Sequence, residues 1–167
     1  MHTGNVVVAW VTTAQDRLQG AVRAADLDLR ELAALTLIAE HEGCSLEWLR
    51  VRVALTQSGT VRLVDRLAAR SLLRRGHSTG RGVPLHLTGE GAARLTQWRE
   101  ARDAVVEELL AGMPYTLRGP VVDAMAAALL VSSRRRAEAD ATCRSCSWAA
   151  CGDDCPVDGS VAVEDET

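Results

Sequence analysis

Residues 45–88 constrain the fold more than any other part of the chain. They begin with two short stretches that carry apolar residues at helical spacing, and residues 56–59 (TQSG) separate the two. Two short helices joined by a turn of three or four residues match helix-turn-helix geometry. Three glycines then separate two short apolar runs, and Pro84 restricts the second run to an edge strand. The sequence therefore predicts a helix-turn-helix followed by a small two-stranded wing.

Helical patterns are predicted on both sides of this unit. Residues 5–25 have helical composition, and Asp28 begins a second helix in which Glu31 completes a capping box. After the wing, Thr88 caps a long helix, and a last helix is predicted over residues 116–136. The chain is thus expected to be mainly α with a small β wing. Because its end helices are more apolar than a monomer needs, we expect a homodimer formed by the N- and C-terminal helices.

Charge is distributed unevenly along the chain. Residues 45–94 hold nine arginines and only three acidic residues, although the whole chain has a net charge of −3. Arginine attracts phosphates by its charge, and its planar guanidinium adds bidentate contacts. A positive segment with a helix-turn-helix pattern indicates binding to double-stranded DNA.

The span SLEWLRVRVALTQSGTVRLVDRLAARSLLRR, with the glycine-rich loop and PLHLTGEGAARL that follow it, resembles the winged helix-turn-helix of the MarR family. The resemblance extends over about residues 5–135 and is strongest over 45–95. It implies a dimeric transcription factor that binds a pseudo-palindromic operator and is often released by a small-molecule effector or by thiol oxidation. In this family the second helix of the motif enters the major groove, and the wing contacts the minor groove.

Carried over position by position, the resemblance assigns DNA contacts to the recognition helix and the wing. One departure is Thr79, which stands where the family usually has an Asp that braces the wing arginine. The DNA-binding residues expected on this basis are Gln57, Ser58, Gly59, Thr60 and Arg62 at the start of the recognition helix, Arg66 and Arg70 further along it, and Arg75 and Arg81 in the wing.

The second motif is a cysteine cluster, TCRSCSWAACGDDCP, with the spacing C-x2-C-x4-C-x3-C. Four thiols this close together, with no sign of secretion, indicate a metal rather than disulfides. Four thiolates can bind zinc tetrahedrally or hold an iron–sulfur cluster, and the spacing leaves both alternatives open. We expect Trp148 to pack this segment onto the rest of the chain. The predicted ligands are Cys143, Cys146, Cys151 and Cys155.

Cys44 stands apart from the cluster, just before the helix-turn-helix. We expect it to be a small buried apolar residue, with a peroxide-sensing thiol as the alternative.

These patterns divide the chain into three parts. Residues 1–136 are predicted to be a MarR-like winged helix-turn-helix domain with dimerisation helices, whose DNA-reading part is 45–95. Residues 137–157 form a cysteine-rich metal-binding module, and residues 158–167 are an acidic tail that we expect to be disordered. No run of about 18 apolar residues and no signal peptide occurs, so we expect a cytoplasmic location without membrane contact.

The predicted function is therefore a dimeric, DNA-binding transcriptional regulator of the MarR type that a four-cysteine metal site modulates or stabilises. The alternative is a protein-interaction module with an acidic, cysteine-rich docking tail and weak or no DNA binding, which the missing wing Asp favours. No nucleophile, metalloprotease or phosphate-loop motif is present, so an enzyme is not expected.

Overall fold

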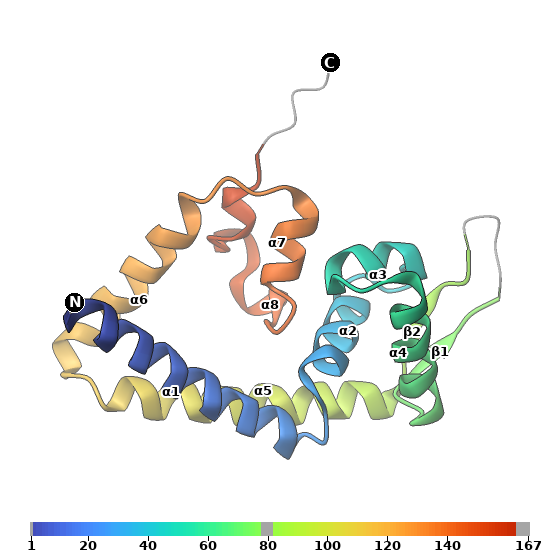
Figure 1. The fold of residues 1–167 in the computed structure, drawn as a ribbon, viewed down its shortest axis with the longest axis horizontal. Helices are drawn as coiled ribbons and strands as arrows, with labels where there is room; N and C mark the ends of the chain where they lie inside the picture. Colours follow the sequence, from blue (N-terminus) through green and yellow to red (C-terminus); the bar gives the residue numbers. More distant parts are fainter. Residues whose placement is uncertain (1, 78–81, 163–167) are drawn as a thin grey trace.

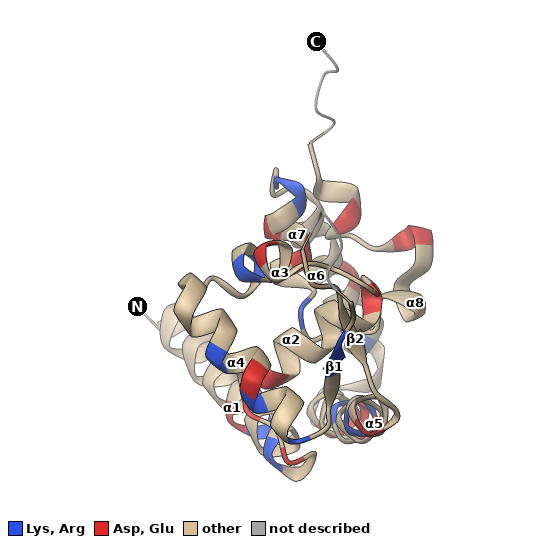
Figure 2. Cartoon of the chain, turned by 90° about the vertical axis from the view of Figure 1, so that its right-hand side faces the viewer, with Lys and Arg blue, Asp and Glu red and all other residues tan. Residues whose placement is uncertain are grey.

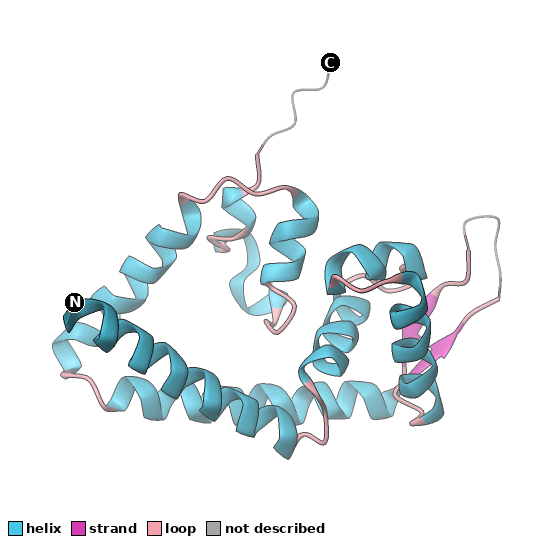
Figure 3. Cartoon of the chain, in the orientation of Figure 1, coloured by secondary structure: helices cyan, strands magenta, loops and turns pink. Residues whose placement is uncertain are grey.

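The computed structural model describes residues 2–77 and 82–162 (Figure 1). Within these ranges the chain is mostly helical, with one two-stranded antiparallel sheet (Figure 3). The predicted mainly α fold with a small β wing is confirmed. None of the described helices combines the length and the apolar composition that a bilayer span requires.

The order of elements follows the sequence pattern closely. Side chains accept the backbone N–H groups at the start of four helices: Asp28, Ser45, Thr56 and Thr88 each cap the helix that follows. The predicted capping box of Asp28 and Glu31 is present. The elements are α1 (His2–Ala24), α2 (Leu29–Glu40), α3 (Leu46–Val53), α4 (Gln57–Ala69), β1 (Leu73–Arg75), β2 (Leu85–Leu87), α5 (Gly89–Ala111), α6 (Tyr115–Leu130), α7 (Arg136–Thr142), α8 (Trp148–Cys151), and the 3-10 turns η1 (Gly152–Asp154) and η2 (Asp158–Ser160).

The wing is a short hairpin that continues directly into α5. Leu73 pairs with Leu87 and Arg75 with Leu85, so the leucines of the two strands turn toward the core. Gly91 in the first turn of α5 lies against the chain just before β1, where an added Cβ would come within 2.1 Å of the Leu72 carbonyl oxygen. This close approach seats the wing on α5.

The main core lies inside the winged helix-turn-helix. Leucines and one isoleucine from α2, α3, α4, the wing and α5 are almost completely buried there. Each such side chain contributes roughly 1.5–3 kcal/mol when it leaves water. The fully buried set includes Leu32, Leu35, Leu37, Ile38, Leu49, Leu67, Leu72, Leu85 and Leu95.

The end helices are packed on one side only. Helix α1 lies along α5, and α6 turns back from the far end of α5 (Figure 1). No residue of α6 is buried. Apolar side chains therefore remain exposed on both helices: Val6, Val7, Val8, Trp10 and Val11 on α1, and Tyr115, Leu117, Val122, Met125 and Leu130 on α6.

Residues 134–162, here called the cysteine module, fold between α6 and α3 (Figure 1). The module has a small core of its own, made of Ala139, Cys143 and Val157. Its two ends are neighbours, because Arg134 and Val161 form a parallel bridge.

The expectation of a disordered tail from residue 158 onward is wrong at its beginning. Residues 158–160 form η2, which packs on α6, and Ser160 is buried. The Ser160 hydroxyl accepts a hydrogen bond from Arg134 at 2.7 Å, and this bond secures the segment. The rest of the acidic end, residues 163–167, lies outside the described residues.

Candidate functional site

The exposed start of α4 is the candidate nucleic-acid interface. Gln57, Ser58 and Arg62 are exposed there and, with Thr56 and Val61, line a shallow surface hollow. The first backbone N–H groups of a helix, together with its dipole, favour an anion. Thr56 accepts one of these N–H groups, from Gly59 at 3.1 Å, so Gly59 takes part through its backbone.

Two arginines of the positive segment have no carboxylate partner within the described parts of the chain. Arg62 lies on α4 and Arg74 on β1, and both side chains are exposed. Figure 2 shows the basic residues of α4 and β1 among acidic ones. An arginine without an internal partner keeps its full charge available for a phosphate.

The prediction that Thr60 contacts DNA is wrong. Its side chain is completely buried, and its hydroxyl donates a hydrogen bond to the Thr56 carbonyl at 3.0 Å. It therefore stabilises the first turn of α4 from the inside and does not face a ligand.

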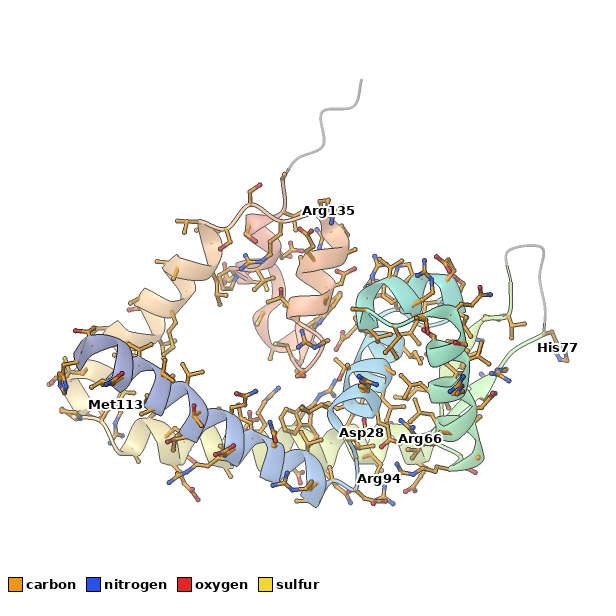
Figure 4. All side chains as sticks on the ribbon, in the orientation of Figure 1. Asp28, Arg66, His77, Arg94, Met113 and Arg135 are labelled. Carbon is orange, nitrogen blue, oxygen red and sulfur yellow. The ribbon has the colours of Figure 1, made fainter. Side chains whose placement is uncertain are left out.

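Arg66 and Arg70 are also placed differently from the prediction that they face DNA. Both bind the buried carboxylate of Glu31 on α2: Nε of Arg66 lies 3.0 Å from Oε1, and Nη1 of Arg70 lies 2.8 Å from Oε2. Arg66 also pairs with Asp28 at 3.3 Å, and both residues are labelled in Figure 4. Arg70 binds Asp26 as well. These two arginines attach the recognition helix to the start of α2.

Of the two wing arginines predicted to bind DNA, Arg75 has a carboxylate partner within the chain. Arg75 pairs with Asp65 of α4 at 2.7 Å, which joins wing and recognition helix and leaves less of its charge for DNA. Arg81 and Thr79 lie outside the described residues, so the wing-tip contact stays a prediction.

The four cysteines of the second motif gather around one cavity. A volume of about 80 Å³ lies between Cys143, Cys146, Cys151 and Cys155, with Trp148 also in its wall. The thiol of Cys143 interacts with those of Cys146 and Cys155, and Cys151 interacts with Cys155. However, no three Cys, His, Asp or Glu side chains among the described residues are arranged to hold a single metal ion.

The thiols around the cavity differ in acidity. The hydrogen bond that Cys143 donates lowers the pKa of Cys146 to about 7, and the charges of Arg102 and Arg144 act in the same direction. The same interaction raises the pKa of Cys143, and burial raises that of Cys151. Cys146 is therefore readily available as a thiolate at neutral pH.

Cys44 lies outside this group. It is half-buried against the main core, and burial raises the pKa of its thiol to about 11. Such a thiol is a poor nucleophile, which favours the expected apolar role over peroxide sensing.

Arg52 of α3 connects the cysteine module to the helix-turn-helix. Its Nε donates to the buried carboxylate of Asp140 on α7 at 2.6 Å. The same guanidinium lies 3.7 Å from the centre of the Trp48 ring. This pair leaves no signal in the sequence, because no spacing rule relates residues 88 positions apart.

Aromatic rings form a second connection. The His41 ring lies between Trp48 of α3 and Trp148 of α8, with centroids 4.3 and 5.0 Å away. The Trp148 backbone N–H is 3.4 Å from the Glu40 carboxylate, and the Trp98 indole N–H donates to the Ser145 carbonyl at 3.2 Å. The prediction that Trp148 packs the module onto the body is confirmed.

A family model described as the MarR family matches residues 25–82, which hold α2, α3, α4 and β1. This segment, about a third of the chain, is therefore similar to the MarR family. A comparison with curated proteins gives no match.

Solved structures extend this likeness beyond the matched segment. Protein RV1404 of Mycobacterium tuberculosis is 22% identical with a TM-score of 0.67, covering 74% of this chain and 88% of that one. A MarR-family transcriptional regulator of Rhodococcus sp. RHA1 is 23% identical with a TM-score of 0.57, covering 74% and 89%. CouR of Rhodococcus jostii RHA1, bound to p-coumaroyl-CoA, is 24% identical with a TM-score of 0.55, covering 74% and 88%. These likenesses show the fold.

Proposed function

We propose that the protein is a homodimeric, DNA-binding transcriptional regulator of the MarR type, in which a metal bound by four cysteines modulates or stabilises the DNA-binding form. The observation that carries the proposal is the start of α4, where Gln57, Ser58 and Arg62 project from a helix N-terminus. In this arrangement Arg62 and Arg74 bind phosphates, and Gln57 and Ser58 reach base edges in the major groove.

The dimer is supported by the exposed apolar faces of α1 and α6. Five apolar side chains of α1 and five of α6 keep between 37% and 84% of their surface exposed, and a second copy would cover them. A two-fold symmetric dimer presents two α4 helices, which fits an operator with two half-sites.

The metal is supported by the four thiols around one cavity. Thiolates bind zinc and iron–sulfur clusters, and the donor set fits either group. When bound, such a group would cross-link residues 143–155 and so hold together a module whose own core is small.

A small-molecule effector is a further part of the proposal. Its support is the solved structure of CouR, which contains p-coumaroyl-CoA.

Duplex DNA binding measured against salt concentration tests this function. The logarithm of the affinity should fall linearly with the logarithm of salt concentration. Replacing Arg62 by alanine should reduce the slope by about one unit for each arginine removed, hence by about two in a dimer. Arg23→Ala, which removes an exposed arginine from the end of α1, is the matched control and should leave the slope unchanged. An affinity that does not depend on salt would overturn the proposal.

A further inference from the structure

We propose that the cysteine module is a strut between α6 and the helix-turn-helix, which fixes the distance between the two recognition helices of the dimer. The spacing of the operator half-sites is then part of the DNA specificity of the protein. This inference rests on the proposed function, because it concerns a dimer that reads two half-sites. It does not depend on what the four cysteines bind, since none of the contacts that carry it involves a thiol.

The first end of the strut is fixed to α6. The guanidinium of Arg134 donates to the Leu129 carbonyl at 2.6 Å and to the Ser160 hydroxyl at 2.7 Å. Gly159 of η2 lies so close to α6 that an added Cβ would come within 3.0 Å of the Leu130 Cδ1 atom. The backbone N–H and carbonyl of Arg134 also bond to the segment that follows Gly159. The module is therefore held to the C-terminal end of α6.

The second end of the strut lies on α3 and on the end of α2. The almost fully buried carboxylate of Asp140 pairs with Arg52 at 2.6 Å. The Trp148 ring lies edge-on against the ring of His41, which in turn lies against the Trp48 ring. An ion pair and an aromatic contact thus join α7 and α8 to the helix-turn-helix.

Between its two ends the module also contacts α5. The Trp98 indole N–H donates to the Ser145 carbonyl at 3.2 Å, and the Trp98 ring itself is part of the main core. Helix α5 runs from the wing to the start of α6, and Figure 1 shows the module joining α6 back to α3. These elements form a closed frame. Long helices such as α5 bend, and the frame opposes a bend that would change the distance between α3 and α6.

The frame determines where each recognition helix lies in the dimer. In a symmetric dimer joined by α1 and α6, this position follows from how the helix-turn-helix is held relative to α6. Because α3 packs directly on α4, the strut places α4 as well. One base pair more or less between the half-sites shifts one of them by about 3.4 Å and turns it by about 35° around the DNA axis. A fixed frame does not follow this change, so we expect one preferred spacing.

The experiment is a selection from a library of duplex DNA, carried out with the full-length protein and its variants in parallel. A randomised stretch of about 40 base pairs has room for two half-sites one or two helical turns apart. The sequence of the selected half-sites reports on α4, and the number of base pairs between them reports on the frame. The unsubstituted protein should select a single spacing.

Two variants release the second end of the strut. Trp148→Ala removes the ring that lies on His41. Asp140→Asn keeps the shape of the side chain but removes the charge that pairs with Arg52. Both should select the same half-site sequence at several spacings. The preference for the original spacing over one changed by a single base pair should fall on the order of ten-fold, within the usual range of coupling between sites.

The matched control is Asp153→Asn, which removes an exposed acid of η1 and should keep the single spacing. Circular dichroism and size-exclusion chromatography establish that each variant is a folded dimer. If Trp148→Ala does not fold, Asp140→Asn, which preserves the side-chain volume, carries the test.

The outcomes separate this inference from the proposed function. A folded variant that keeps the single spacing, or that loses affinity for all spacings by the same factor, would overturn the strut while DNA binding stands. An unsubstituted protein that accepts several spacings equally well would overturn it too. If the unsubstituted protein selects no DNA, the proposed function fails and the strut with it.

Discussion

The winged helix-turn-helix and the cysteine module are stabilised in different ways. The first buries many large aliphatic side chains almost completely, drawn from six segments of the chain. The second has a core of one alanine, one cysteine and one valine, and depends on contacts at its edges such as Asp140–Arg52 and Arg134–Ser160. A hydrophobic core makes the first self-sufficient, whereas a small core requires a cross-link or a partner surface. We expect the two regions to respond differently to the same kind of perturbation.

The largest expected effect is in the main core. Leu35→Ala removes a fully buried side chain, which should lower the free energy of unfolding by about 2–5 kcal/mol because a cavity remains. Val157→Ala in the module should instead leave the unfolding of the helix-turn-helix nearly unchanged. Denaturation followed by circular dichroism measures both, and equal losses would show that the two regions unfold as one unit.

Next in size is the effect at Glu31, which joins α2 to α4. Glu31→Gln removes the charge that Arg66 and Arg70 share, and the expected cost is about 1–3 kcal/mol. Thermal unfolding measures it, with Glu100→Gln on the exposed face of α5 as the matched control. If Glu31→Gln costs no more than the control, the attachment of α4 to α2 is not energetically significant.

A smaller and local effect is expected from metal removal. A chelator should make residues 143–157 accessible to protease, while residues 29–75 stay resistant because their core contains no metal ligand. Mass spectrometry of the fragments locates the cuts. If both regions lose their resistance to protease together, the winged helix-turn-helix is not stable independently of the metal.

The smallest effect concerns the thiol outside the module. With a pKa of about 11, Cys44 should react slowly with iodoacetamide at pH 7, and its rate should rise about ten-fold per pH unit until the thiol ionises. In metal-free protein, Cys146, with a pKa of about 7, should react faster and level off above that pH. Peptide mass spectrometry separates the two sites.

Cys44→Ala should leave DNA affinity within roughly two-fold, as expected for a substitution away from the interface.

Local signals in the sequence predicted most of the fold. The caps at Asp28, Ser45 and Thr88 act over three or four residues, so they can be recognised without the tertiary structure. The helix-turn-helix and the hairpin follow from apolar spacing in the same way. The attachment of Trp148 was anticipated because an isolated aromatic residue in a small segment needs a surface to cover it.

Long-range pairing explains what the sequence did not reveal. Arg66 and Arg70 have the spacing of an exposed basic face, but their carboxylate partners on α2 and before it are at least 35 residues away. Thr60 was placed on the outer face, although its position one turn after Thr56 turns it inward. Asp140 and Arg52 become partners only when α7 folds back against α3.

The neighbouring ends of the cysteine module have an evolutionary consequence. Arg134 and Val161 are bridged, so the chain enters and leaves the module at the same place. A segment with adjacent ends can be gained, exchanged or lost without changing the path of the chain before it. The same property makes residues 134–162 transferable: spliced after the last helix of another regulator of this fold, they would meet an equivalent α3, where an arginine and a tryptophan four residues apart would supply one part of the attachment seen here.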